Sequence, residues 1–205
     1  MADINSKPET LCDDRIGDVA ADLAPEQKPE LAIERTSEVA GGPALPAGDL
    51  VKYVELLFFA YRDFTGDADE LLADLGYGRA HHRVIHFVGR HPGLRVADLL
   101  DILRITKQSL ARVLKQLIDE GFVTQQSGKT DRRERHLHLT QSGQDFAEKL
   151  SKLQCARIGR ALDKVGPEAR RSVEAFLVAM IGDDDQTAVI ALLEKAARNE
   201  HDAQR

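Results

Sequence analysis

The segment from 96 to 139 constrains the fold more than any other part of this sequence, because two short helices and a hairpin follow one another closely there. Apolar residues at helical spacing predict one helix over 96–103, and a second that follows the N-cap residue Thr106 and ends near Glu120. Gly121 then suits the left-handed conformation that commonly ends a helix. Two short helices joined by so tight a connection form the helix-turn-helix pattern.

The second helix of this pair has an inward apolar face that consists of Leu110, Val113, Leu114, Leu117 and Ile118. Its opposite face is polar and basic, and such a helix fits the major groove of B-DNA, where residues near the helix N-terminus reach deepest. The positions that we predict to contact DNA from this helix are Thr106, Lys107, Gln108, Ser109, Arg112 and Lys115. Gln108 can pair with adenine and Arg112 with guanine. The hydroxyls of Thr106 and Ser109 suit phosphate.

A β-hairpin with a basic tip is predicted after this helix. Residues 122–125 have the composition of a strand, and residues 135–139 alternate polar with apolar side chains as a half-buried strand does. The remaining predicted DNA contacts come from this hairpin and are Lys129, Arg132, Arg133 and Arg135. A thin hairpin with arginines can enter a minor groove, whose narrow form attracts them. We expect Asp131 to pair with an arginine and so to orient the tip of this wing.

The net charge of −6 hides an uneven distribution of charged residues. Residues 1–48 contain 10 acidic and 4 basic residues, whereas residues 79–138 contain 12 Lys and Arg against 6 Asp and Glu. Local charge, rather than total charge, determines whether a surface binds phosphate. The basic block coincides with the predicted helix-turn-helix and wing, so the distribution favours nucleic-acid binding.

The chain is expected to contain five segments. Scattered apolar residues and several prolines predict that residues 1–48 are a disordered acidic arm. We expect a long helix within 49–76, a winged helix-turn-helix domain within 77–139, further helices within 140–199 and a frayed tail at 200–205. The expected fold class is therefore mainly α with a small β wing.

Local signals predict where the helices outside this pair begin and end. One helix is expected over 79–90, before a Pro-Gly turn. Thr140 is expected to start a long helix that ends near Val165, and Pro167 to open the next one, since proline is well suited to the first helical position. Residues 182–185 are predicted to form a turn before a last helix.

Three motifs taken together resemble the MarR family of bacterial winged-helix regulators. They lie at 105–123, at the Asp-Arg-Arg of 131–133, and at 137–143, where Leu-Thr-x-x-Gly leaves the hairpin. The resemblance extends over 49–165. Within the family, the stretch 78–117 is most similar to the PetP-like branch.

The resemblance implies a cytoplasmic transcriptional regulator that binds a palindromic double-stranded DNA operator as a homodimer. It also implies modulation by a small ligand, pH or a redox signal, and a helical dimerisation region in which the first and last helices of two subunits interlock. The apolar stripes of 50–75, 146–165 and 173–193 exceed what a small winged domain needs for its own core. Residues 182–199 depart from the usual family ending by adding a turn and a helix.

Members of the family often bind a small anionic ligand beside the helix that corresponds to 79–90. The candidates for effector binding in this sequence are His81, His82, Arg83 and His86. These side chains could meet a carboxylate, or they could be structural or face DNA. His82 and His86 also have zinc-like spacing, but a third ligand would have to come from Asp63, Asp67 or His136, so we expect no metal site.

The two cysteines are candidates for redox sensing. Cys155 lies beside the apolar stripe of the helix over 140–165, where a free cysteine is usually a small hydrophobic residue. Arg157 and Lys152 are close to it in sequence and would favour a thiolate. Cys12 lies in the acidic arm.

Other functional classes lack their sequence signatures. We find no P-loop, dinucleotide fingerprint, nucleophile elbow or His-Glu-x-x-His pattern, so we expect neither enzymatic activity nor a cofactor. No apolar run approaches the roughly 18 residues of a membrane helix, and the acidic N-terminus does not resemble a signal peptide. The alternative is a winged-helix module that binds protein rather than DNA. The basic face over 107–135 favours DNA, since a protein-binding module would not need it.

Overall fold

A computed structural model describes residues 46–128, 131 and 133–203 of the chain. The predicted arm of residues 1–48 therefore lies almost entirely outside the described residues. The chain divides into two compact units, 1–66 and 67–205, which we describe separately. Helix α2 (Ala47–Ala73) crosses the boundary between them.

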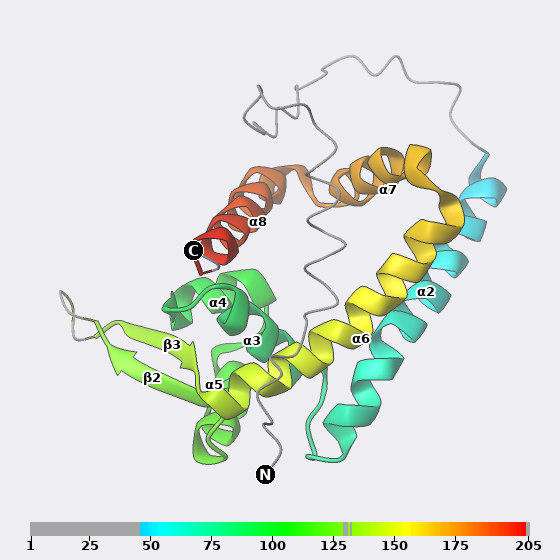
Figure 1. Ribbon diagram of the computed structural model, residues 1–205. Helices are drawn as coiled ribbons and strands as arrows, with labels where there is room; N and C mark the ends of the chain where they lie inside the picture. Colours follow the sequence, from blue (N-terminus) through cyan, green and yellow to red (C-terminus); the bar gives the residue numbers. More distant parts are fainter. Residues whose placement is uncertain (1–45, 129–130, 132, 204–205) are drawn as a thin grey trace, which may run out of the picture. The chain divides into compact units, whose positions relative to one another are not determined.

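The second unit is mainly helical and contains one small sheet (Figure 1). Its elements in chain order are α3 (Arg79–Arg90), β1 (Leu94–Arg95), α4 (Val96–Leu103), α5 (Lys107–Asp119), β2 (Val123–Ser127), β3 (Arg135–Leu139), α6 (Gln141–Val165), α7 (Pro167–Ala179) and α8 (Asp183–Ala203). The three strands are antiparallel in the order β1-β3-β2. This arrangement confirms the predicted fold class, and the hairpin β2–β3 extends away from α3, α4 and α5 in Figure 1.

The core of the second unit lies where α3 packs against α5, α6 and β3. Its fully buried large side chains come from each of these elements and from α4, and include Ile85, Leu99, Leu117, Leu137 and Leu150. Fully burying such a side chain stabilises a fold by about 1.5–3 kcal/mol. Packing of its apolar side against this core therefore fixes the position of α5 and of the side chains on its outward face.

A tight junction joins the end of α5 to the start of α6. Gly121 has a φ of 78°, which only glycine adopts without strain. The hydroxyl of Thr140 donates to the carbonyl of Gly121 at 2.6 Å and accepts from the amide of Gly143 at 3.0 Å. A Cβ on Gly143 would lie 2.1 Å from the carbonyl oxygen of Phe122, so glycine is needed there. This junction fixes where the hairpin begins and ends.

The sequence predicted most helix ends correctly, but it missed strand β1 and the start of α8. Helices over 79–90 and 96–103 are confirmed, as are the N-caps Thr106 and Thr140. Strand β1 was not predicted, because two residues carry no strand pattern of their own and become a strand only by pairing with β3. Helix α4 is thus preceded by strand β1 and not only by a turn.

The prediction of a turn at 182–185 was wrong. Helix α8 begins at Asp183, so three aspartates form its first turn, where negative charge is stabilised by the helix dipole. Nη2 of Arg104 lies 2.6 Å from Oδ2 of Asp185, which anchors this turn to the end of α4. The helix also continues to Ala203, so the tail predicted to fray from 200 is helical over 200–203.

Large apolar side chains remain exposed in each unit. In the first unit, the exposed residues of α2 are Leu50, Val51, Tyr53, Val54, Leu56, Leu57, Phe58, Phe59 and Tyr61. In the second unit, they are Leu75, Ile158, Val165, Phe176, Leu177, Met180 and Leu193. Within the described parts of the chain, no helix is both long enough and apolar enough to span a membrane.

Candidate nucleic-acid interface

Helix α5 displays the polar face that its sequence predicts. Thr106 caps the helix, because its side-chain oxygen accepts from the amide of Ser109 at 3.1 Å. Leu110, Leu114 and Leu117 are buried against the core. The residues near the helix N-terminus that are exposed on the other side are Lys107, Gln108, Ser109 and Arg112. The structure therefore presents these side chains together on one outward surface.

The two predicted phosphate-binding hydroxyls are engaged with each other. The Thr106 hydroxyl donates to Oγ of Ser109 at 2.8 Å, in addition to capping the helix. The Ser109 hydroxyl can still donate its own proton, and the first backbone amides of a helix attract anions. Contact between these groups and phosphate stays a prediction.

The cations of α5 differ in their surroundings. Lys115 forms an ion pair with Asp119 one turn later, so an anion already lies beside it. Among the described residues, Lys107 and Arg112 form no ion pair. A phosphate or base that binds Lys107 or Arg112 would therefore not have to displace a paired acidic side chain of the described residues.

The tip of the wing is shaped by backbone contacts. The Gly128 amide donates to the Glu134 carbonyl at 3.0 Å, and the Glu134 amide donates to the Asp131 carbonyl at 3.1 Å. A Cβ on Gly128 would lie 2.4 Å from that Asp131 oxygen, so only glycine fits. The predicted contacts Lys129 and Arg132 lie outside the described residues.

The orienting role predicted for Asp131 takes a different form from a side-chain ion pair. Oδ1 of Asp131 accepts from the backbone amide of Arg133 at 2.8 Å, which is a local turn contact. Arg133 is exposed, and Nη1 of Arg135 donates to the Ser127 hydroxyl at 2.6 Å across the hairpin. Asp131 thus fixes the backbone that carries Arg133 rather than its guanidinium group.

A polar cluster at the base of the wing was missed by the sequence analysis. Arg95 is held by Asp98, with its Nε 2.8 Å from Oδ2 and its Nη2 2.6 Å from Oδ1. Its Nη1 also lies 3.2 Å from Oε1 of Glu134. The hydrogen bonds from Arg95 lower the pKa of Asp98. Because Arg95 and Glu134 are 39 residues apart in the sequence, no local pattern indicates their contact.

The four predicted effector residues do not converge on one site. His81 contacts Gln116 of α5, and Nη2 of Arg83 donates to the carbonyl of Leu103 at 2.7 Å. His82 is buried and bonds to Gln154 of α6. His82 and His86 lie one turn apart on α3, and the charge of His82 acts on His86.

His81 belongs to a network that ties α3 to the end of α5. Its Nδ1 accepts from the amide of Gly78 at 3.1 Å, so its Nε2 donates to Oε1 of Gln116 at 2.9 Å. The Gln116 amide donates to Glu120 at 3.0 Å, and the Tyr77 hydroxyl donates to the same carboxylate. Tyr77 also stacks on His81 with ring centroids 4.6 Å apart. The hydrogen bonds from Tyr77 and Gln116 lower the pKa of Glu120.

Burial lowers the pKa of three histidines, His82 and His86 on α3 and His91 just after it. It lowers the pKa of His86 to about 4, with the positive charges of His82, Arg90 and His91 acting in the same direction. His86 therefore titrates below the physiological range.

Each residue considered as a third zinc ligand has another partner. Asp63 lies 2.8 Å from Arg62, Asp67 is 2.9 Å from Arg157, and His136 is 3.2 Å from Glu134. Within the described residues, no group of three or more His, Cys, Asp or Glu side chains could hold a metal ion.

The neighbours proposed to activate Cys155 have acidic partners. Cys155 is a free, half-buried thiol on α6. Nζ of Lys152 lies 2.7 Å from Glu148, and Arg157 is paired with Asp67. Redox sensing through Cys155 stays a prediction, and Cys12 lies outside the described residues.

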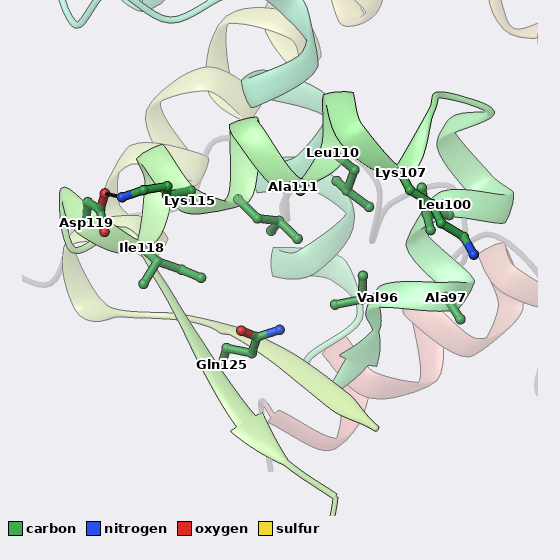
Figure 2. A pocket seen from close by; sticks show the side chains of 11 residues that line it. Val96, Ala97, Leu100, Lys107, Leu110, Ala111, Lys115, Ile118, Asp119 and Gln125 are labelled. Atoms are coloured by element: carbon green, nitrogen blue, oxygen red, sulfur yellow. Dashed lines mark hydrogen bonds and ion pairs between the residues drawn. The ribbon is translucent and has the colours of Figure 1, made fainter. Parts of the chain in front are cut away.

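A hollow of about 590 Å³ lies between α4, α5 and β2 (Figure 2). Apolar side chains such as Val96, Leu100 and Leu110 line it, together with Lys107 and Lys115. The predicted effector residues are absent from its lining, which consists of described residues. Asp119, the ion-pair partner of Lys115, lines the hollow too, so the surface beside α5 is concave and Lys107 is its lysine without an ion pair among the described residues.

Comparisons with known proteins agree on one family. A family model described as MarR family matches residues 75–134. The HTH-type transcriptional regulator PetP of Rhodobacter capsulatus is 49% identical over 132 residues, which cover 64% of this chain and 80% of that protein.

Solved structures share the fold at lower identity. Staphylococcus aureus MepR in a DNA-binding conformation has a TM-score of 0.57 at 18% identity, covering 63% of this chain and 96% of that one. A MarR-family transcriptional regulator from Silicibacter pomeroyi has a TM-score of 0.54 at 21% identity, covering 62% and 85%. A MarR transcriptional regulator from Methanosarcina mazei Go1 has a TM-score of 0.54 at 23% identity, covering 64% and 94%.

Proposed function

The chain belongs to the MarR family, and from that premise we propose that it is a transcriptional regulator that binds a palindromic DNA operator as a homodimer. The observation that carries this proposal is the exposed polar face of α5 beside an arginine-bearing wing in one domain. The relative that is 49% identical is an HTH-type transcriptional regulator, which supports the same function.

The residues of α5 have distinct roles in this proposal. Gln108 and Arg112 contact base edges in the major groove, and Lys107 contacts a base or a phosphate near the helix start. Thr106, Ser109 and Lys115 contact the DNA backbone. Backbone contacts position the protein, whereas base contacts specify the sequence.

The wing supplies the second set of contacts. Arg133 and Arg135, with Lys129 and Arg132, bind the backbone or a narrow minor groove next to the major-groove site. Asp131 orients the wing through the backbone of Arg133. This arrangement gives each subunit two contacts with the duplex.

Dimerisation accounts for the exposed apolar residues. Exposed patches of this size on a protein usually mark an interaction surface. These residues lie on α2, at Leu75 just after it, and on the segment from α6 to α8, and we propose that a second copy of the chain covers them. Two-fold symmetry then matches a palindromic operator with half-sites about one DNA turn apart.

Modulation by a signal is a further part of the proposal. A ligand switches a regulator only if it binds the DNA-competent and incompetent dimers with different affinities. His82 and His86 are the effector candidates that remain adjacent, and a small anionic ligand or Cys155 oxidation are the alternatives. We expect a cytoplasmic protein without a cofactor or catalytic activity, because neither is needed for this function.

Fluorescence anisotropy with DNA from upstream of the protein's own gene, compared with scrambled DNA, tests the proposal. We expect tight binding to the native sequence and weak, salt-sensitive binding to the scrambled one. The double variant Lys107→Ala/Arg112→Ala should lose most of this preference. The control Lys149→Ala/Lys164→Ala removes the same charge from exposed positions on α6 and should keep it. Absence of binding at low salt would contradict the proposal and favour a protein-interaction module.

A further inference from the structure

We propose that Arg95, Glu134 and His136 are positioning residues that hold the wing in the geometry that binds DNA, and that His136 completes this contact only when it is protonated. The inference rests on the proposed DNA-binding function. The inference adds a proton-dependent contact to that function, and this contact lies at the base of the wing rather than in an effector pocket.

The cluster connects three parts of the winged domain. Glu134 directly precedes β3, and its carboxylate meets Arg95 through Oε1 and His136 through Oε2, both at 3.2 Å. Arg95 is anchored to α4 through Asp98. Nδ1 of His136 lies 2.9 Å from the carbonyl oxygen of Gly93, which precedes β1. Glu134 therefore contacts β1 directly through Arg95, and its second partner, His136 of β3, contacts the residue that precedes β1.

The hydrogen-bond partners of His136 require two protons on its ring. The Gly93 carbonyl and the Glu134 carboxylate are both acceptors, and each faces a different ring nitrogen. A neutral imidazole has one N–H donor and one acceptor nitrogen. In the neutral form, one nitrogen would therefore direct its lone pair at an acceptor oxygen. The imidazolium donates to both, and its bond to the carboxylate is assisted by charge.

Charged groups around His136 come from three elements. Glu134 lies on the hairpin, Arg95 on β1 pairs with His136 in the sheet, and Asp98 on α4 neutralises Arg95. His138 lies two residues further along β3, next to Gly93. Lys195 of α8 acts on Asp98 from a greater distance. Glu134 is thus the one carboxylate among the described residues that contacts the His136 ring.

The cluster lies directly beside the wing residues that are proposed to bind DNA. Arg133 and Arg135 flank Glu134 in the chain, and the amide and carbonyl of Glu134 close the loop through Asp131 and Gly128. Losing the His136 contact would leave the Glu134 carboxylate held by Arg95 alone and so loosen the loop that Glu134 closes. Since a histidine contact of this kind is present at low pH and lost as pH rises, operator affinity should be about threefold to tenfold higher at pH 6 than at pH 8.

Glu134→Gln tests the proton requirement directly. The amide oxygen can accept from Arg95, and the amide nitrogen can donate to the acceptor nitrogen of a neutral His136, so every contact is kept without a proton. Its operator affinity should change less than twofold between pH 6 and pH 8. The matched control is His138→Gln, which removes a neighbouring histidine and should keep the wild-type ratio. The ratio of affinities is compared because removing a negative charge raises affinity at every pH.

Hydrogen exchange on the DNA-free protein separates this inference from the proposed function. Protection factors of the Gly128 and Glu134 amides should be about threefold higher at pH 6 than at pH 8 in the wild type, and equal in Glu134→Gln. The inference is overturned if Glu134→Gln keeps the wild-type pH ratio, or if wild-type protection does not change with pH. Absence of DNA binding at both pH values would contradict the proposed function. The exchange experiment would still decide the role of His136.

Discussion

Gln108 occupies the position on α5 from which one side chain can identify one base. It is exposed one residue into the helix and lies beside the charged residues Lys107 and Arg112. We expect Gln108→Ala to relax base preference at one position per half-site by about 1–3 kcal/mol. Anisotropy with a set of single-base operator variants measures this. An equal loss of affinity for every sequence would instead make Gln108 a backbone contact.

Arg133 is an exposed wing residue that we propose to contact DNA phosphate. Arg133→Ala should weaken operator binding and reduce the slope of log K against log salt by about one per subunit, because a phosphate contact releases a counterion. The comparison is with Arg171→Ala on α7, where the same charge is removed from an exposed position far along the chain. An unchanged slope for Arg133→Ala would show that the wing residue does not contact phosphate.

His86 on α3 is a half-buried histidine that should make the stability of the protein sensitive to acid. Since burial lowers the pKa of His86 to about 4, the folded state favours its neutral form. This contribution to stability is complete above about pH 6.5 and is lost as pH falls toward 4. The unfolding free energy of the wild type should fall between pH 7 and pH 4.5. In His86→Gln this fall should be smaller by roughly 1–2 kcal/mol.

Urea unfolding followed by circular dichroism at the two pH values measures this difference. His201→Gln, an exposed position on α8, serves as the control and should follow the wild type. If His86→Gln also follows the wild type, His86 is not responsible for the acid sensitivity.

At the scale of the element, α5 depends on the cap at Thr106. Thr106→Ala should lower the unfolding free energy by about 1 kcal/mol, because the amide of Ser109 loses its partner. Thr106→Ser keeps the capping oxygen and should retain most of the stability. Denaturant midpoints compared at equal slope measure both variants. A loss in Thr106→Ser as large as that in Thr106→Ala would mean that the methyl group, rather than the cap, matters.

Elements with strong local signals were predictable from the sequence. Thr106, Gly121 and Pro167 mark helix ends by chemistry that involves only their immediate neighbours, and the structure places them at those ends. Strand β1 was not predictable in this way, because it depends on pairing with β3. The start of α8 was predicted wrongly, although three aspartates are a local signal for the first turn of a helix.

The same distinction separates the candidate site into two parts. The face of α5 follows from helical periodicity, so its exposed residues could be identified in advance. The contacts among Arg95, Glu134 and His136 join residues 39 and 2 positions apart through the folded sheet. A sequence of alternating polar and apolar residues predicts that His136 lies on one face of β3, but not which groups meet it there.

At the scale of the whole molecule, the proposed function requires a dimer. Phe176, Leu177 and Met180 are about half exposed on and beside α7, and solvent exposure of so many large side chains is unfavourable. Leu177→Glu should shift the protein toward monomer and reduce operator affinity, since burying an unpaired charge at an interface is costly. Sedimentation velocity measures the first effect and anisotropy the second. Arg171→Glu on the same helix is the control and should remain dimeric.

Hydroxyl-radical footprinting on DNA from upstream of the protein's own gene tests the central claim most directly. A dimer that presents two α5 helices and two wings should protect two symmetric half-sites whose centres lie about 10 base pairs apart. Protection should weaken at the flanks when Arg133 is replaced by Ala and disappear when Lys107 and Arg112 are both replaced. One unpaired protected patch, or uniform protection without preferred positions, would contradict the proposed dimeric operator complex.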